Sequence, residues 1–325
     1  MDIGVINHSF SIQLPSLQLV VDSTSLGEFK TCPRKYYYRM IEGWVPKSTS
    51  VHLTFGILLH QGRETYEHAK ASGLNHEDSL RAAVRASLAS TWDKETGRPW
   101  WSNNPDKNRY TLIRTLVHYL DTFGRDDRLQ TVILSNGKPA IELSFKFVPV
   151  DLNSGEEFKS VTGEQIYFSG HLDRIVSLEE NQYISDVKTT SSALNSYYFS
   201  RYSPDNQFSM YTLAGMAAFQ TQISGIICDA IKVKAEFNKF ERQLIPRTPD
   251  QIHEWLGDTK YYLSLMGRMA EAGRWPQNDK ACHFYGGCPY RPVCSRTPGA
   301  RQTWLEADYT KSIWDPSIAR GEENG

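Results

Sequence analysis

Hydrophobic residues recur every three or four positions through roughly the first third of the chain. This period is typical of amphipathic helices that bury one face. It predicts two short helices between residues 24 and 40 and longer helices over 51–71, 78–92 and 108–123. A stretch rich in Gly, Pro and Trp at 94–106 interrupts the pattern and is expected to form a loop.

Further along the chain the period changes to two, which predicts β-strands. Helical patterns alternate with these strands, so we expect an α/β fold with a mixed sheet flanked by helices. The sequence predicts strands over 141–147, 166–178, 183–188, 225–233 and 240–245, a turn at 179–181, and helices over 204–219 and 250–273.

The composition is that of an ordinary globular protein. Of 325 residues 40% are hydrophobic, and 36 Lys and Arg face 37 Asp and Glu, for a formal net charge of −1. Whole-chain disorder, collagen and coiled-coil arrays are excluded. We expect one decorated domain over 1–325, with a mainly helical part at 24–128, an α/β core at 139–275, a cysteine segment at 281–297 and a flexible tail at 315–325.

The longest uncharged run, 206–228, is long enough to raise the question of a membrane span. It holds many amide and hydroxyl side chains, so we interpret it as a buried helix that runs into a strand. The chain begins without a basic segment or a cleavage signal, so we expect a cytoplasmic protein without a membrane partner.

Charged residues gather on two predicted strands. Because residues two apart share a face of a strand, Asp186 and Lys188 face one way and Val187 the other. His171 and Asp173 likewise share a face of the preceding strand, and an antiparallel hairpin would bring Asp173 opposite Asp186. Two carboxylates and a main-chain carbonyl suit Mg²⁺ or Mn²⁺, and the lysine would orient or deprotonate a water. The alternative is a set of solvated charges on an exposed sheet.

The cysteines form a second pattern. Cys282, Cys288 and Cys294 are each separated by five residues, and Cys32 lies far upstream. Cys228 follows two isoleucines and is interpreted as a small buried hydrophobic residue. In a reducing compartment disulfides are not expected. Zinc sites usually contain close cysteine pairs, which this chain lacks, so the spacing favours an iron–sulfur cluster, with zinc as the alternative.

The runs Gly170–Ile175 (GHLDRI) and Ser185–Thr189 (SDVKT) resemble the PD-(D/E)XK nuclease superfamily. The closer resemblance is to its RecB-like branch, which includes the AddB-like nuclease domains of AddAB and the nucleases of CRISPR adaptation. The run Gly56–His60 resembles the helical His motif of this branch, and Gln207–Tyr211 resembles its Gln-x-x-x-Tyr motif. The run Ser25–Tyr36 resembles the opening of its iron–sulfur members.

The resemblance implies a restriction-endonuclease-like core and a role for each matching residue. The implied catalytic residues are Lys188, Asp186, Asp173, His60, Gln207 and Tyr211, and the implied metal ligands are His60, Asp173, Asp186 and the carbonyl of Val187. A [4Fe–4S] cluster held by Cys32, Cys282, Cys288 and Cys294 would fasten the C-terminal segment to the N-terminal helices.

We therefore expect a Mg²⁺- or Mn²⁺-dependent deoxyribonuclease, an exonuclease acting on single-stranded DNA or DNA ends in recombination, repair or CRISPR-type processing. A homo-oligomer and a helicase or recombination partner are also expected. The rival hypothesis is a non-catalytic DNA-binding subunit, and a further alternative is a nuclease acting on RNA.

Other positions have two interpretations. Arg34, Lys35 and Arg39 alternate with the tyrosines at 36–38, and this set either binds phosphates and bases or packs internally. Trp100 and Trp101 either stack on bases or cover the core, and the helical segment 78–128 is a candidate gating insertion. Glu142 is expected on the solvent face of its strand, and Glu64, one turn after His60, is a weak site candidate.

Overall fold

The structure is a computed structural model that describes residues 12–13, 17–48, 50–220 and 222–318. The chain divides into two compact units, each built from separate stretches of sequence. Unit 1 comprises Met1–Ser48, Ser144–Gly170 and Pro249–Gly325, and unit 2 comprises Thr49–Leu143 and His171–Thr248. Strands β8 (Ile141–Phe147) and β9 (Tyr167–Leu178) pair with each other and contribute residues to both units.

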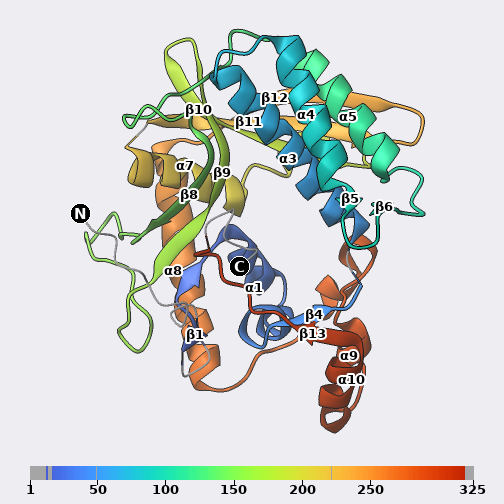
Figure 1. The fold of residues 1–325 in the computed structure, drawn as a ribbon. Helices are drawn as coiled ribbons and strands as arrows, with labels where there is room; N and C mark the ends of the chain where they lie inside the picture. The colour runs from blue at the N-terminus through green and yellow to red at the C-terminus, as the bar shows by residue number, and fades with distance from the viewer. Residues whose placement is uncertain (1–11, 14–16, 49, 221, 319–325) are drawn as a thin grey trace. The chain divides into compact units, whose positions relative to one another are not determined.

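Unit 2 contains a layer of three helices, α3 (Val51–Ala71), α4 (His76–Ser90) and α5 (Arg109–Phe123) (Figure 1). Asn75 and Asn108 cap α4 and α5 by accepting hydrogen bonds from the backbone three residues on. Its other elements are β5 (Trp92–Asp93), β6 (Arg98–Pro99), β7 (Gln130–Thr131), β10 (Asn181–Thr190), α6 (Ser196–Ser200), α7 (Asn206–Phe219), β11 (Ile223–Val233) and β12 (Asn238–Pro246).

The strands of unit 2 follow the order β12-β11-β10-β9, and β7 also pairs with β9. Strands β9 and β10 form an antiparallel hairpin whose register ends at Ser185 opposite Arg174. Strand β10 pairs in parallel with β11, and helices α6 and α7 make the crossover that such a pair requires. Strand β12 returns antiparallel to β11.

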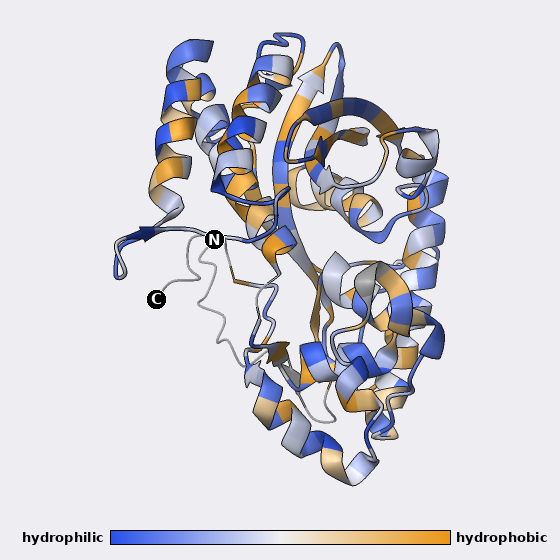
Figure 2. Cartoon of the chain, turned by 90° about the vertical axis from the view of Figure 1, so that its right-hand side faces the viewer, coloured by the Kyte–Doolittle hydropathy of each residue, from blue (hydrophilic) through white to orange (hydrophobic). Residues whose placement is uncertain are grey.

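The three-helix layer packs on the sheet through a continuous apolar core. Figure 2 shows hydrophobic and hydrophilic residues alternating around the helices, as expected when one face is buried. Gly62 is required for this packing, because a Cβ there would lie 2.5 Å from Ser87 Oγ and 2.7 Å from Leu116 Cδ2. The buried members of this core are Phe55, Leu58, Leu59, Tyr66, Ala83, Leu112, Leu116, Tyr119, Leu120, Val187, Ile231 and Val233.

Unit 1 has a second core that joins its N-terminal and C-terminal segments. Strand β4 (Trp44–Pro46) pairs antiparallel with β13 (Tyr309–Lys311), and β3 (Val20–Val21) pairs in parallel with the first residues of β9. The remaining elements are β1 (Ile12–Gln13), β2 (Leu17–Gln18), α1 (Ser23–Thr31), α2 (Pro33–Tyr36), a π-helical turn (Tyr37–Ile41), α8 (Pro249–Glu271), α9 (Arg291–Cys294), α10 (Arg301–Asp308) and two 3₁₀ segments (Asp279–Gly286 and Pro298–Ala300).

The mixed sheet flanked by helices confirms the fold class expected from the sequence. The predicted helix 51–71 has the observed bounds, whereas α6, α10 and the short strand β3 were not predicted. The predicted tail at 315–325 lies mostly outside the described residues. Within the described residues, none of the helices has the length and hydropathy that crossing a bilayer requires.

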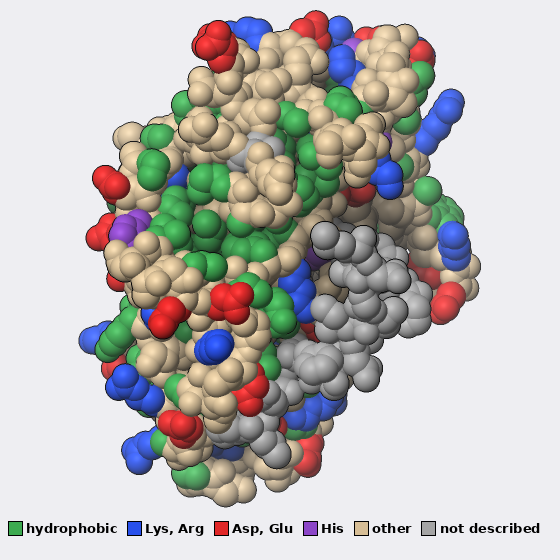
Figure 3. Space-filling view, turned by 90° about the vertical axis from the view of Figure 1, so that its left-hand side faces the viewer, with side chains coloured by type: hydrophobic (Ala, Val, Ile, Leu, Met, Phe, Trp, Pro, Cys, Tyr) green, Lys and Arg blue, Asp and Glu red, His purple; other side chains and the backbone are tan. Residues whose placement is uncertain are grey.

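The tyrosines at 36–38 pack inside unit 1. Tyr36 and Tyr38 are buried, so the interpretation that they stack on bases is wrong, and Tyr37 stacks on Trp275 with 5.7 Å between ring centroids. Their charged neighbours also have internal partners: Lys35 pairs with Glu28, Arg34 donates to the carbonyl of Trp275, and Arg39 donates to that of Ser312. Figure 3 shows charges of both signs interspersed over one face of the molecule.

Candidate active site

The β9–β10 hairpin brings two carboxylates together in unit 2. Continuing its register by one pair beyond Ser185 and Arg174 sets Asp186 opposite Asp173. Both carboxylates are buried, with 1% of Asp186 and 4% of Asp173 exposed. Burying two like charges side by side is unfavourable unless cations compensate them.

Lys188 provides one of these cations. Its Nζ lies 2.9 Å from both oxygens of Asp186 and donates a hydrogen bond to Oδ1. A second hydrogen bond, 2.7 Å long, goes to Gln207 Oε1, and Gln207 Nε2 donates to the hydroxyl of Tyr211 at 2.9 Å. Gln207 and Tyr211 lie one turn apart on α7, whose N-terminus is capped by Asp205. The Asp-x-Lys and Gln-x-x-x-Tyr segments thus form one connected chain of polar groups.

His60 of α3 contacts both strands of the hairpin. Its Nε2 lies 3.0 Å from the carbonyl oxygen of Val187, and its Nδ1 lies 3.0 Å from Asp173 Oδ2. A carbonyl only accepts, so Nε2 carries a hydrogen and donates it. In the neutral imidazole Nδ1 then offers a lone pair toward a carboxylate, and this buried nitrogen has no hydrogen bond. That arrangement requires a shared cation, either a proton or a metal ion.

Arg63 is a buried residue of this site that sequence reasoning missed. Its Nη1 donates to Asp173 Oδ2 at 3.0 Å, and its Nη2 lies 3.3 Å from both the carbonyl and the hydroxyl oxygens of Ser185. One guanidinium therefore fixes a carboxylate of β9 and the backbone of β10. The available signal was its position three residues after His60, on the same side of the helix.

Glu142 also belongs to the site, and its expected place on the solvent face is corrected. Ligand atoms of His60, Glu142 and Asp173 all lie within 4.8 Å of one another. The backbone of Glu142 has a φ of +48°, which is uncommon for a residue with a side chain. This left-handed residue interrupts the two-residue period of β8, which is why alternation alone assigned the wrong face.

The charges of the site shift the pKa values of its members. Burial would raise the pKa of Asp173, but His60 and then Arg63 hold it well below its usual range. Burial raises the pKa of Asp186 even though Lys188 opposes this. For Lys188, burial would lower the pKa, but the Asp186 carboxylate raises it above its usual range. The lysine is therefore held as an ammonium.

The donor set fits a divalent cation. The site holds three carboxylates, of Glu142, Asp173 and Asp186, together with the buried guanidinium of Arg63 and the half-buried ammonium of Lys188. Oxygen ligands with an imidazole nitrogen suit Mg²⁺ or Mn²⁺. Two buried ligand atoms, His60 Nδ1 and Asp186 Oδ2, have no hydrogen bond. Buried polar atoms without a hydrogen bond are rare, and a bound ion is one explanation for them.

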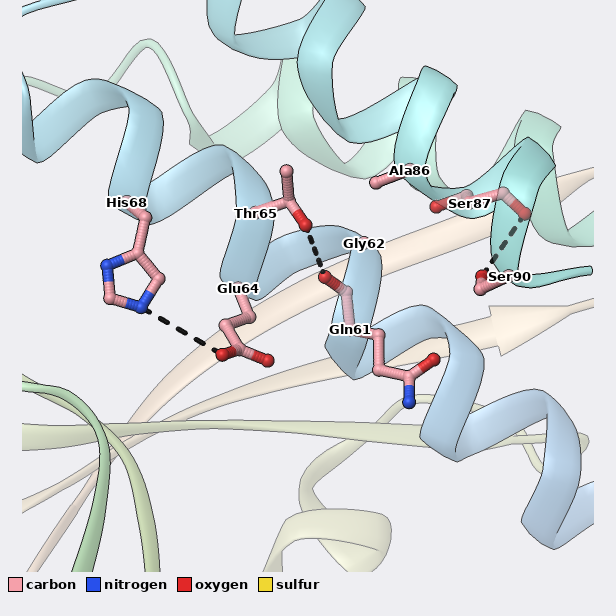
Figure 4. A pocket seen from close by; sticks show the side chains of 8 residues that line it. All are labelled: Gln61, Gly62, Glu64, Thr65, His68, Ala86, Ser87 and Ser90. Carbon is pink, nitrogen blue, oxygen red and sulfur yellow. Dashed lines mark hydrogen bonds and ion pairs between the residues drawn. The ribbon is translucent and has the colours of Figure 1, made fainter. Parts of the chain in front are cut away.

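A groove lies between α3 and α4, with a volume of about 310 Å³ (Figure 4). Glu64 lines it and lies 3.9 Å from His68, one turn further along the helix. The carboxylate of Glu64 is not among the clustered ligand atoms of His60, Glu142 and Asp173. The groove therefore adjoins the site along α3 without containing its ligands.

The four cysteines of the expected cluster belong to one unit, and the fifth cysteine belongs to the other. Cys32, Cys282, Cys288 and Cys294 all belong to unit 1, whereas Cys228 is buried on β11 of unit 2. The backbone nitrogen of Asn278 lies 3.4 Å from Cys32 Sγ, and its carbonyl accepts from Cys282 Sγ at 3.7 Å.

Cys288 and Cys294 pack on the aromatic core of unit 1. Burial raises the pKa of the Cys288 thiol, and the nearby Cys32 and Cys282 add to the shift. In the described part of the chain, no three of these sulfur atoms lie within 4.8 Å of one another.

Comparison with families of known proteins agrees with this arrangement. The model of the PD-(D/E)XK nuclease superfamily matches residues 23–295. The chain belongs to the PD-(D/E)XK nuclease superfamily. Its nuclease fold and the acidic cluster with His60 accord with the divalent-metal chemistry of that superfamily. No curated protein matches the sequence.

Two solved structures show distant similarity. A Eubacterium rectale protein named as a candidate exonuclease has 11% sequence identity, with 82% of this chain and 86% of that chain covered and a TM-score of 0.45. A protein named SSO0001 has 12% identity, with 74% and 75% covered and a TM-score of 0.30. Both similarities are too low to assign a substrate.

Proposed function

We propose that the chain is a metal-dependent deoxyribonuclease that hydrolyses phosphodiester bonds, acting as an exonuclease on single-stranded DNA or DNA ends. The observation that carries the proposal is the half-buried cluster of acidic and imidazole groups in unit 2. His60, Glu142 and Asp173 offer ligand atoms within 4.8 Å of one another, and Lys188 is bonded to Asp186 on the adjoining strand. The superfamily match over residues 23–295 supports hydrolysis of nucleic acid.

His60, Glu142, Asp173 and Asp186 would hold a Mg²⁺ or Mn²⁺ ion, with the carbonyl of Val187 beside them. Such an ion stabilises negative charge on the phosphoryl oxygens and lowers the pKa of a bound water. Val187 holds the imidazole by accepting from Nε2, which keeps Nδ1 available as a ligand. Arg63 also holds the Asp173 carboxylate in place by donating to its Oδ2.

Lys188 orients the attacking water by donating a hydrogen bond to it. The raised pKa of Lys188 keeps this group an ammonium, so donation is favoured over removal of a proton. Gln207 accepts a hydrogen bond from Lys188 and donates one to Tyr211, so the amide fixes the ammonium and the phenol relative to each other. Gln207 and Tyr211 thereby support the lysine and the scissile phosphate.

A cleavage assay on end-labelled oligonucleotides tests this function. With Mn²⁺, the full chain should shorten single-stranded DNA, and Lys188→Ala and Asp186→Ala should each reduce the rate by at least about a hundredfold. Lys239→Ala is the matched control, because Lys239 is an exposed strand lysine that pairs only loosely with Glu241. The product ladder reports the direction of digestion.

The same assay distinguishes the alternatives. Retention of metal-dependent cleavage by Lys188→Ala would overturn the assignment. If wild type and variants all bind DNA and none cleaves it, the chain is a non-catalytic architectural subunit. Matched RNA oligonucleotides test whether RNA is the preferred substrate.

We further propose that Cys32, Cys282, Cys288 and Cys294 hold a [4Fe–4S] cluster that fastens the ends of unit 1. Four free thiols in one unit, two of them contacting Asn278, support a shared inorganic group.

Iron and acid-labile sulfide analysis of anaerobically purified protein tests the cluster. Cys288→Ser should lose iron, the visible colour and much of its stability, because the cluster contributes to folding. Cys228→Ala is the matched control and should retain the iron and the colour. Stoichiometric zinc in place of iron would overturn the cluster assignment.

The cellular role is proposed from the RecB-like motifs alone. A single decorated nuclease domain over 1–325 is supported by the superfamily match, which spans sequence from both units. Such a chain would work in the cytoplasm in DNA repair, recombination or CRISPR-type processing, with itself or a helicase as partner. Size-exclusion chromatography with light scattering tests self-association.

A further inference from the structure

The β5–β6 hairpin, the loop that follows it and the first turn of α5 expose three large aromatic side chains. Trp101 is 78% exposed, Tyr110 is 73% exposed and Trp92 is 47% exposed. Single exposed apolar residues are common on protein surfaces, but aromatics gathered in one short segment are typical of binding sites. Figure 1 shows this β5–β6 hairpin at one end of the three-helix layer of unit 2.

The segment holds these side chains on a fixed backbone. Trp100 packs against the core of unit 2, and its amide donates to the carbonyl of Thr91 at 2.7 Å. Asn104 Oδ1 accepts from the amides of Asp106 and Lys107, which closes the following turn. Trp100 thus covers the core, whereas its neighbour Trp101 is directed to solvent by the same anchored loop.

Cationic side chains lie among the aromatics. The guanidinium of Arg109 lies 5.8 Å from the centre of the Trp92 ring and donates to Thr91 Oγ1. Arg98 is exposed on β6, directly opposite Asp93, and Lys94 is exposed in the turn. The carboxylate of Asp93 caps that turn by accepting two backbone amides. Exposed π-faces with interspersed cations are the combination that binds unpaired nucleotides.

The same loop adjoins the helix that carries His60. Lys107 Nζ lies 4.1 Å from the centre of the Phe55 ring on α3. Phe55 precedes His60 by five residues, which is about 7.5 Å along a helix. Leu53 and Ile57, both at least half exposed, precede His60 by seven and three residues and so lie on the same helix face. Leu53 and Ile57 thus place exposed apolar side chains on the face of α3 that carries His60, whereas Phe55, which meets the loop, is buried on the other face.

We propose that Trp101 and Tyr110, with Trp92, form a stacking platform for single-stranded DNA at the end of the helix layer that carries His60. The proposal rests on the proposed nuclease function and adds a binding site for the substrate: unpaired nucleotides held outside the cleavage site. Stacking uses the faces of the bases and therefore selects unpaired strands without selecting sequence.

Binding measured apart from cleavage tests the platform. The full chain carrying Lys188→Ala serves as the parent, and the probe is fluorescein-labelled oligothymidylate, with a blunt duplex of equal length for comparison. Trp101→Ala and Tyr110→Ala should each weaken binding of the single strand about 5- to 150-fold, the range expected for loss of one stacked base. Binding of the duplex should change much less, and Trp101→Phe should restore most of the affinity.

Tyr261→Ala is the matched control, because Tyr261 is a comparably exposed aromatic on α8 of unit 1. Unchanged affinity in Trp101→Ala and Tyr110→Ala would overturn the platform, as would equal losses for the single strand and the duplex or an equal loss in Tyr261→Ala. Thermal unfolding of each variant checks that the fold is retained. The nuclease function fails separately, through absence of cleavage by the wild-type chain.

Discussion

Lys188 Nζ lies 2.9 Å from both carboxylate oxygens of Asp186, yet only Oδ1 accepts a hydrogen bond and Oδ2 accepts none. The pair is thus matched in charge but incomplete in hydrogen bonding. A buried carboxylate oxygen without a partner is costly in a purely structural ion pair. The same geometry is useful if this oxygen binds an ion when the site is loaded.

Stability and activity should separate at this pair. Lys188→Met leaves the Asp186 charge buried and unpaired, which should lower the free energy of unfolding by about 3–5 kcal/mol. The double variant Lys188→Met/Asp186→Asn removes both charges and should recover most of that loss while remaining inactive. Urea unfolding and the cleavage assay measure the two effects. If the double variant is no more stable than Lys188→Met, the unpaired charge of Asp186 is not the cause of the lost stability.

Replacing Glu142 should raise the stability of the apo protein and weaken the binding of the metal ion. Its φ of +48° is strained for a side chain but open to glycine, so Glu142→Gly should stabilise the apo protein by about 1 kcal/mol. The variant also loses a carboxylate ligand, so Mn²⁺ should no longer raise its melting temperature.

Glu179→Gly provides the control for this experiment. Glu179 has a φ of +54° in the turn between β9 and β10, and its carboxylate is not among the clustered ligand atoms. It should gain similar stability and keep the full response to Mn²⁺. A normal Mn²⁺ response in Glu142→Gly would remove Glu142 from the metal site.

The difference between Glu142 and Asp186 marks the limit of inference from the sequence. Asp186 and Lys188 lie in a regular strand, so alternation correctly assigned them to one face, and the hairpin turn fixed the register with Asp173. Glu142 lies in a strand with a left-handed residue, and no local pattern of residue types announces that conformation. Its proximity to His60 appears only in the folded chain.

Arg63 and the aromatic loop show the same limit at longer range. The helical period correctly buried one face of α3, but the bond from Arg63 to Asp173 joins segments that are 110 residues apart. The sequence also left Trp100 and Trp101 as equivalent alternatives. The structure separates them, because only the first packs on the core. Which of two neighbours faces solvent depends on how the loop is anchored, and periodicity carries no information on irregular loops.

Replacing the buried Arg63 should lower the free energy of unfolding more than replacing an exposed arginine does. Arg63→Met leaves Asp173 without its guanidinium and the Ser185 oxygens without a donor, so the free energy of unfolding should fall by about 3–5 kcal/mol. Arg63→Lys keeps the charge but not the two-pronged geometry and should recover only part of it. Arg81→Met, in an exposed pair with Asp78, should change stability by less than about 1 kcal/mol. A comparable loss in both methionine variants would contradict the assigned role.

Lys107 should make the free energy of unfolding depend on pH in the alkaline range. Its side chain is only 3% exposed, Nζ has no hydrogen bond, and burial lowers its pKa from 10.5 to about 8. Below pH 8 the amine is charged in both states, so the folded state carries the cost of burying the charge. Between pH 8 and 10.5 the unfolded state binds more protons than the folded state, so stability should rise with pH.

Lys107→Met isolates this contribution, because methionine has a similar length and no charge. At pH 7 the free energy of unfolding of the variant should exceed that of wild type by up to about 3 kcal/mol, which is the free energy that corresponds to the pKa difference of Lys107. The attraction between the Lys107 ammonium and the Phe55 ring, which the variant loses, reduces this gain. The advantage should shrink toward zero as pH approaches 10.5. Urea unfolding of both proteins at several pH values measures it, with exposed Lys94→Met as the control that shows no such trend. A difference between Lys107→Met and wild type that does not change with pH would mean that the pKa of this amine is the same in the folded and unfolded states, which contradicts its burial as a charged group.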